Sequence, residues 1–146
     1  MTALAAREWV FSFPAPTRLL NMNERLHWTT ERARARAWRT TARINVPKSV
    51  PTDGALPAAL VHVALPVLGA RRRDPHNYFP TVKHIVDGLV DAGLWPDDTP
   101  EYVTTLEPTL VPYPAGQLHR PLRPQHQGAV PHGAPVVVTI TERGAL

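Results

Sequence analysis

Five apolar residues in the middle of the chain recur at helical spacing and form one continuous stripe. They stand at i, i+3, i+4, i+7 and i+8: Val82, Ile85, Val86, Leu89 and Val90. A stripe of this width is the face that a helix packs against another layer. Pro80 suits the first turn, where its missing N–H breaks no intrahelical bond, and Gly93 can end the helix in a left-handed conformation. The pattern predicts a helix from Tyr78 to Ala92, with Asn77 as its N-cap, that packs on a sheet.

Four further segments carry the alternating or continuous apolar residues of strands. These segments are Trp9–Phe13, Ala59–Leu68, Glu101–Val111 and Val136–Thr141. A second helix, rich in Arg, is predicted to begin near Thr29 or Thr30. At 146 residues and 43% apolar content, the chain is large enough to bury the core of one domain. We therefore expect a single α+β domain over residues 1–146, in which a small mixed sheet has two main helices packed on one face.

Residues 112–135 are rich in Pro, Gly, Gln and His and show no periodicity. Such a composition predicts a long loop or a disordered insertion within the domain. His119, His126 and His132 lie in this segment at spacings of seven and six residues. This spacing lacks the compact pattern of metal ligands, so we expect no metal site there.

Several classes of protein have no support in the sequence. No apolar run approaches the length of a membrane span, and the first residues lack the pattern of a signal peptide, so we expect a cytoplasmic protein with no membrane partner. The absence of Cys excludes disulfides, a thiolate nucleophile and any Cys-based zinc site. The chain also lacks a Gly-rich phosphate loop, a G-x-S-x-G turn and an H-E-x-x-H helix.

Basic residues dominate the charged surface. The net charge is +4, the isoelectric point is about 10.1, and most of the positive charge is Arg. Four arginines recur at intervals of four, three and four residues and line one face of the second predicted helix: Arg32, Arg36, Arg39 and Arg43. A row of this kind can follow a nucleic-acid backbone, although it can also be an ordinary exposed helix face. The lack of any acid after Glu31 in this helix favours nucleic-acid binding.

Acidic residues surround the first predicted helix. Asp74 precedes it, Asp87 and Asp91 follow Lys83 along it at intervals of four, and the pair Asp97–Asp98 comes just after it. One interpretation is a solvated helix face with intrahelical ion pairs. Acids brought close together, however, repel one another unless a cation offsets their charge. A divalent metal would do so, and Arg71, Arg72 and Arg73 directly before Asp74 would attract a phosphate to the same place.

The segments RRRDPHN, PTVKHIVDGLVDAG and the closing DD resemble the RusA family of Holliday junction resolvases, in particular its actinobacterial and phage-type members. The block NMNERLHW, from Asn21 to Trp28, and the Arg-rich segment after it extend the resemblance over the first two thirds of the chain. The resemblance assigns four residues to the active site or its support: Asp74, Lys83, Asp87 and Asp98. Asn77 and Asp97 are expected to support them.

The resemblance implies a metal-dependent, structure-selective endodeoxyribonuclease that resolves four-way DNA junctions in recombination and repair, in a host or prophage setting. Mg²⁺ or Mn²⁺ held by Asp74 and Asp98, with Asp87 as a ligand or in support, would activate a water and polarise the scissile phosphate. Lys83 would neutralise the charge that develops there. A homodimer is implied because a four-way junction has two symmetry-related strands to cut. The alternatives are a junction-binding or architectural DNA protein that does not cut and, more distantly, a hydrolase of a smaller phosphate ester.

One position departs from the better-known family motif, D-x-D-N. His76 stands where that motif has its second acid. Imidazole is a poorer ligand than carboxylate for Mg²⁺ but is tolerated by Mn²⁺. His76 is therefore either a metal ligand or a solvated loop residue beside a phosphate, and the number of metal ions stays open.

Overall fold

The computed structural model describes residues 6–69, 72–113 and 133–143. Its elements follow one another in a mixed order of strands and helices: β1 (Glu8–Pro14), α1 (Trp28–Ile44), β2 (Ala59–Leu68), the 3-10 helix η1 (Pro75–Tyr78), α2 (Phe79–Asp91), β3 (Val103–Thr105), β4 (Thr109–Tyr113) and β5 (Pro135–Glu142). The strands form one mixed sheet, and the α+β class predicted from the sequence is confirmed.

The sheet has the order β1-β5-β2-β3, and β4 pairs with β2 further along the same strand. β5 is antiparallel to both β1 and β2, whereas β3 and β4 are parallel to β2. The strand predicted over Glu101–Val111 is thus two short strands that follow one edge of β2. The interruption includes Pro108, which has no N–H to donate to the ladder.

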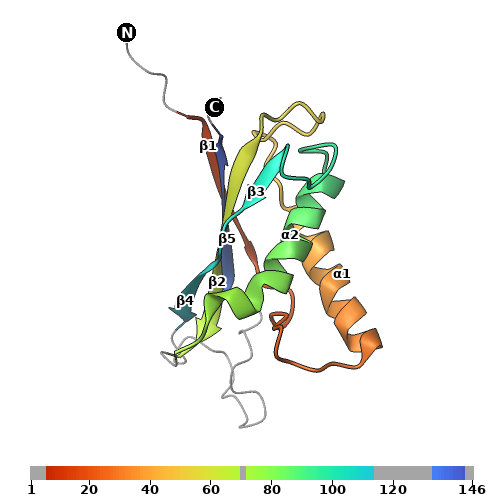
Figure 1. The fold of residues 1–146 in the computed structure, drawn as a ribbon, viewed down its shortest axis with the longest axis vertical. Coiled ribbons are helices and arrows are strands. Elements are labelled where there is room, and N and C mark those ends of the chain that lie inside the picture. Colours follow the sequence, from red (N-terminus) through yellow and green to blue (C-terminus); the bar gives the residue numbers. More distant parts are fainter. Residues whose placement is uncertain (1–5, 70–71, 114–132, 144–146) are drawn as a thin grey trace.

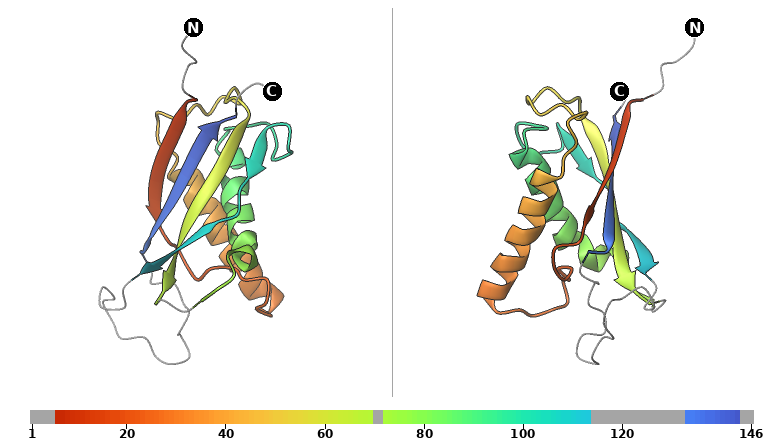
Figure 2. Two further views of the ribbon diagram at one scale, coloured as in Figure 1. Left: turned by 60° about the vertical axis from the view of Figure 1, so that its left-hand side comes forward. Right: turned by 180° about the vertical axis from the view of Figure 1, so that it is seen from behind.

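Both helices cover the same face of the sheet, as Figure 1 and the two views of Figure 2 show. The central strand β2 turns alternate residues toward them, and this face is fully buried at Val61, Val63 and Leu65. β5 contributes a second buried row beside it, which includes Val138 and Ile140. The apolar stripe of α2 packs against this layer, and all of it except Val90 is buried. The helix stripe found in the sequence is therefore the inner surface of the domain.

The predicted start of α2 is wrong in one detail. Asn77 is not the N-cap, because the chain enters α2 through η1 and Asn77 lies inside that turn, with its N–H bonded to the carbonyl oxygen of Asp74. Tyr78 stands at the N-cap of α2 and makes no side-chain capping bond there. The carboxylate of Asp74 caps η1 instead, by accepting the N–H of His76 at 3.0 Å. Pro80 lies in the first turn of α2, as predicted.

The end of α2 follows the sequence prediction closely. The helix ends at Asp91, and Gly93 has φ of 100°. Two hydrogen bonds close this end: the Gly93 N–H donates to the Val90 carbonyl oxygen at 2.9 Å, and the Leu94 N–H donates to that of Leu89 at 3.2 Å. This pair of bonds is the left-handed C-terminal motif that the Gly predicted.

The other predicted boundaries differ by small amounts. β2 has the predicted bounds, β1 and β5 are each one residue longer at both ends, and α1 begins one residue before Thr29. The loop predicted over residues 112–135 is wrong at its edges, because β4 runs to Tyr113 and β5 begins at Pro135. His119, His126 and His132 lie outside the described residues. Among the described helices, none has the length and apolar character needed to cross a membrane.

α1 and α2 approach each other most closely at Gly88. A Cβ built there would lie 2.2 Å from the carbonyl oxygen of Arg39 and 2.9 Å from the Cβ of Ala42, both in α1. The backbone of α1 can make room for a Cβ at this position only if the whole helix shifts. Only Gly therefore permits this helix packing.

We expect Gly88→Ala to destabilise the fold by about 1–3 kcal/mol, because the added methyl group forces α1 and α2 apart. Helix propensity alone predicts the opposite sign, a gain of about 1 kcal/mol for Ala over Gly. Urea unfolding of both proteins measures the difference. A variant more stable than the wild type would show that the two helices are not held at this distance.

Candidate functional site

Three of the four residues that the sequence assigns to a site lie together. The ammonium group of Lys83 donates a hydrogen bond to the Asp87 carboxylate at 2.9 Å and another to the carboxylate of Asp98. Lys83 and Asp87 lie one turn apart on α2, whereas Asp98 comes from the loop between α2 and β3. We call Lys83, Asp87 and Asp98 the acid–lysine cluster.

Hydrogen bonds set the charges of this cluster. The bond from Lys83 is the main cause that holds the pKa of Asp98 below its ordinary value. Burial lowers the pKa of Lys83, but the bonds to Asp98 and Asp87 outweigh it and leave that pKa raised. At neutral pH the cluster thus holds an ammonium ion against the ionised carboxylate of Asp98. The side chain of Lys83 is half exposed, so the cluster is open to solvent and to a ligand.

The loop that carries Asp98 is fixed from two sides. Arg143, just after β5, donates to the carbonyl oxygens of Pro100 at 2.9 Å and Glu101 at 3.0 Å. On the other side of the loop, the buried indole of Trp95 donates to the carbonyl oxygen of Pro57 at 3.2 Å. The side chain of Asp97, which the sequence analysis named as a support, accepts the N–H of Asp98 at 2.7 Å. Sequence reasoning missed Arg143, because a single Arg beyond the last strand carries no local signal of its partners.

Asp74 occupies a different hydrogen-bonded turn. Its carboxylate accepts the backbone N–H of His76, and the side chain is exposed on the turn that leads into α2. The ring of His76 lies 6.3 Å from that of Phe79. Over residues 6–69, 72–113 and 133–143, no three His, Asp or Glu side chains are grouped so as to hold a metal ion. The structure thus gathers Asp87 and Asp98 but does not group three of the expected ligands.

The carboxylates of the acid–lysine cluster suit a hard divalent cation, whereas its ammonium group does not. Asp87 and Asp98 direct carboxylate oxygens at one point, and oxygen ligands are the type that Mg²⁺ prefers. In the structure, the ammonium group of Lys83 lies at that point. A metal ion bound by both carboxylates would therefore take the place of this ammonium group.

His84 extends the cluster along α2 and was not identified from the sequence. Its Nδ1 lies 3.7 Å from one carboxylate oxygen of Asp87, and Lys83 donates to the other oxygen. Burial is the main cause that lowers the pKa of His84. The helical interval of three residues between His84 and Asp87 was the only signal that could have indicated this contact.

The arginine row on α1 is exposed, but its members have different surroundings. Arg39 makes a two-point ion pair with Asp91 of α2, at 2.5 Å from Nε and 2.8 Å from Nη2. Arg32 lies over the ring of Trp28, with 5.6 Å between the guanidinium carbon and the ring centroid. The intrahelical pairing considered for the acids of α2 thus holds for Lys83 with Asp87, whereas Asp91 pairs across the two helices.

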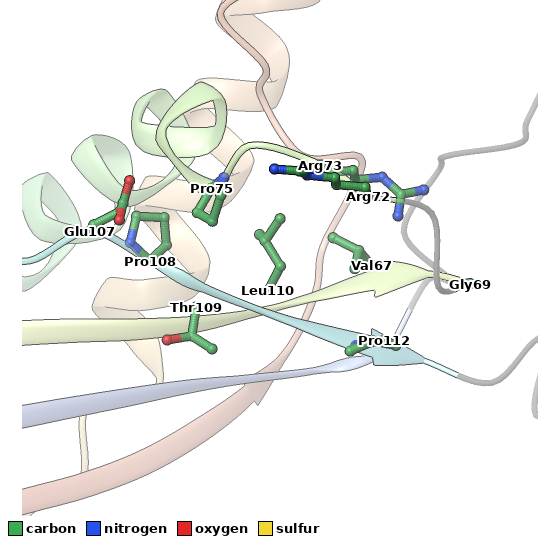
Figure 3. A pocket seen from close by; sticks show the side chains of 10 residues that line it. All are labelled: Val67, Gly69, Arg72, Arg73, Pro75, Glu107, Pro108, Thr109, Leu110 and Pro112. Atoms are coloured by element: carbon green, nitrogen blue, oxygen red, sulfur yellow. The ribbon is translucent and has the colours of Figure 1, made fainter.

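Two of the arginines expected to attract a phosphate follow the C-terminal end of β2. Arg72 and Arg73 line a cavity of about 530 Å³ between this end of the sheet and Pro75 of η1 (Figure 3). One Nη of Arg73 donates to the carbonyl oxygen of Leu68 at 2.9 Å. Arg71 lies outside the described residues. Arg72 and Arg73 are therefore part of a concave surface.

Comparison with known proteins adds no assignment. A scan against protein-family models finds no match to this chain. A search of curated protein sequences finds no match either. The resemblance to RusA resolvases thus stays a prediction from the sequence, to be weighed with the geometry of the acid–lysine cluster.

The Arg39–Asp91 pair predicts a defined pH dependence of stability. A hydrogen bond from Arg39 is the main cause that holds the pKa of Asp91 below its ordinary value of 3.8. The pair therefore stabilises the folded state above about pH 3.8, and this contribution is lost as the pH falls through the folded-state pKa. We expect Asp91→Asn to lower Tm by about 1–3 °C at pH 7, the size typical of a partly exposed pair.

Calorimetry at pH 7 and at about pH 2 checks this expectation, with Glu101→Gln as a control in which an exposed acid is neutralised. The difference between Asp91→Asn and the wild type should disappear at the lower pH. A deficit that persists there would trace the effect to packing and not to the ion pair.

Proposed function

We propose that this protein is a metal-dependent endonuclease that cuts DNA at four-way junctions. The observation that carries the proposal is the acid–lysine cluster, in which one loop and one helix direct two carboxylates and an ammonium group at a single exposed point. Lys83, Asp87 and Asp98 are three of the four residues that the resemblance to RusA resolvases assigns to the active site or its support. A surface with a net charge of +4 supports a polyanionic substrate.

Each residue of the cluster has a role in this proposal. Asp87 and Asp98 would hold Mg²⁺ or Mn²⁺, and Asp74, on the turn before α2, is the third candidate ligand. A bound divalent metal supplies an activated water and polarises the phosphate. Lys83 would place its positive charge beside the phosphate oxygens that become more negative during cleavage. His76, exposed next to Asp74, is a further candidate ligand that favours Mn²⁺ over Mg²⁺.

Arginine side chains provide the surface for DNA. Arg32, Arg36 and Arg43 are exposed along α1, and Arg72 is exposed at the end of β2. Arg39 can contribute positive charge to this surface, although its guanidinium is already bound to Asp91. Because a four-way junction presents two equivalent strands, a homodimer in the cytoplasm is the form that we propose for the active protein.

One observation favours a second candidate function, the binding of junctions without cleavage. The ammonium group of Lys83 already neutralises part of the charge of Asp87 and Asp98, and Asp74 is bonded to its own turn. In this case the basic surface would bind DNA while the acids remained a structural ion network. Cleavage assays separate the two candidates.

We expect Asp98→Asn and Asp74→Asn each to lower the rate of junction cleavage by at least about 100-fold, because each removes charge that the reaction needs. Affinity for the junction should stay the same or rise slightly, since a negative charge that repels phosphate is lost. Cleavage of a labelled four-way junction in Mg²⁺ and in Mn²⁺, with binding measured in EDTA, tests both effects. Asp91→Asn is the matched control, because Asp91 is on the same helix but pairs with Arg39.

Equal loss of cleavage in Asp91→Asn and Asp98→Asn would contradict the assignment of Asp98 to the active site. A wild-type protein that binds junctions in EDTA and cuts them in neither metal would favour the second candidate.

A further inference from the structure

The cavity beside β2 and β4 has two charged ends and an apolar floor. Val67 and Leu110 form the floor, and Figure 3 shows their side chains between the arginines at one end and Glu107 at the other. Pro75 and Pro108 complete the wall on the Glu107 side. The hydroxyl group of Thr109 points to the opposite side of the strand, where it contacts His62 at 2.7 Å. The cavity thus has arginines at one end, apolar side chains at its centre and one carboxylate at the other end.

The basic end suits a phosphate group. Arg72 is exposed, and guanidinium groups donate parallel hydrogen bonds that match phosphate oxygens. The bond from Arg73 to the carbonyl oxygen of Leu68 holds that side chain at the edge of the cavity. Two guanidinium groups at one end therefore define where an anion would bind.

The opposite end suits a group that donates hydrogen bonds. Glu107 is exposed, and an ionised carboxylate only accepts. A planar ring that lay on Val67 and Leu110 would turn one edge toward the end of the cavity that carries Glu107. The cavity volume of about 530 Å³ falls in the range of roughly 300–1,000 Å³ of small-ligand sites, which is enough for one nucleotide.

We propose that this cavity binds one unstacked nucleotide of a DNA strand, with its phosphate at Arg72 and Arg73 and the exocyclic amino group of its base at Glu107. The inference rests on the proposed function in taking DNA as the ligand, and it adds a base-reading site next to Asp74, whose neighbour Pro75 lines the cavity. Adenine, cytosine and guanine each carry an exocyclic amino group, and thymine does not. The single edge donor of thymine is its ring N3–H, which lies between two carbonyl oxygens that repel a carboxylate. The site therefore discriminates against thymine.

The test measures binding in EDTA, where metal-dependent cleavage does not occur. The probes are labelled short strands in which a single A, C, G or T is flanked by abasic sites, and fluorescence anisotropy reports their affinity. The A, C and G strands should bind about tenfold more tightly than the T strand, the size of one hydrogen bond to a charged group. Inorganic phosphate should compete with all four strands.

Two variants assign the contacts. Glu107→Gln should reduce the difference between the T strand and the others to about twofold or less, since an amide both donates and accepts. Arg72→Gln should weaken all four strands alike, because a phosphate contact carries no base information. Glu101→Gln is the matched control, an exposed acid of the same segment that lies outside the cavity, and it should change nothing.

A wild-type protein that binds the T strand as tightly as the others would overturn the proposal, and this result depends on no variant. It would also be overturned if Glu107→Gln kept the full discrimination, if Arg72→Gln left all affinities unchanged, or if only inorganic phosphate bound. Discrimination by a protein that cuts junctions in neither metal would uphold this site and reject the nuclease. Cleavage without discrimination would reject this site and uphold the nuclease.

Discussion

The amphipathic character of α2 is the constraint on which the rest of the structure depends. Burial of Val82, Ile85 and Leu89 against the sheet fixes the rotation of the helix about its axis. This rotation also fixes the directions in which the polar side chains of α2 point. Lys83 and Asp87 face the loop that carries Asp98. The packing of an apolar stripe therefore determines which charged groups can meet.

The distribution of ion pairs explains how a chain with twelve acidic residues keeps a basic surface. Several of these acids are bound by cations of the same chain. Asp91 is bound by Arg39, Glu142 by Arg7, and Glu24 by Arg34. The arginines on α1 other than Arg34 and Arg39, together with Arg72, form no ion pair within the described residues. This division of charge supports the proposal that the protein binds a polyanion.

Local patterns in the sequence predicted the regular elements well. β2 has the bounds that its apolar run indicated, and α2 ends two residues before the Gly that predicted its end, because both signals act within a few residues. Asn77 was misplaced because a 3-10 turn precedes α2, and single-residue capping preferences do not reveal such a turn.

Contacts between distant residues could not be predicted in the same way. The pair Arg39–Asp91 and the bonds from Arg143 to the Asp98 loop join residues that are brought together only by the packing of helix on helix and of strand on strand. Only the part of the candidate site that lies on α2 and in the loop after it was predicted from the sequence. The grouping of Lys83 with Asp98 is the part of the prediction that needed a resemblance to a family.

In the proposed reaction, Lys83 acts at a phosphate and is more than the partner of two carboxylates. Lys83→Gln, assayed with protein in excess over a labelled four-way junction in Mn²⁺, tests this role of the ammonium group. We expect the cleavage rate to fall by at least about 100-fold while affinity for the junction in EDTA and the unfolding temperature change little. A variant that cleaves at the wild-type rate would contradict it, because the ammonium group would then serve only to hold Asp87 and Asp98.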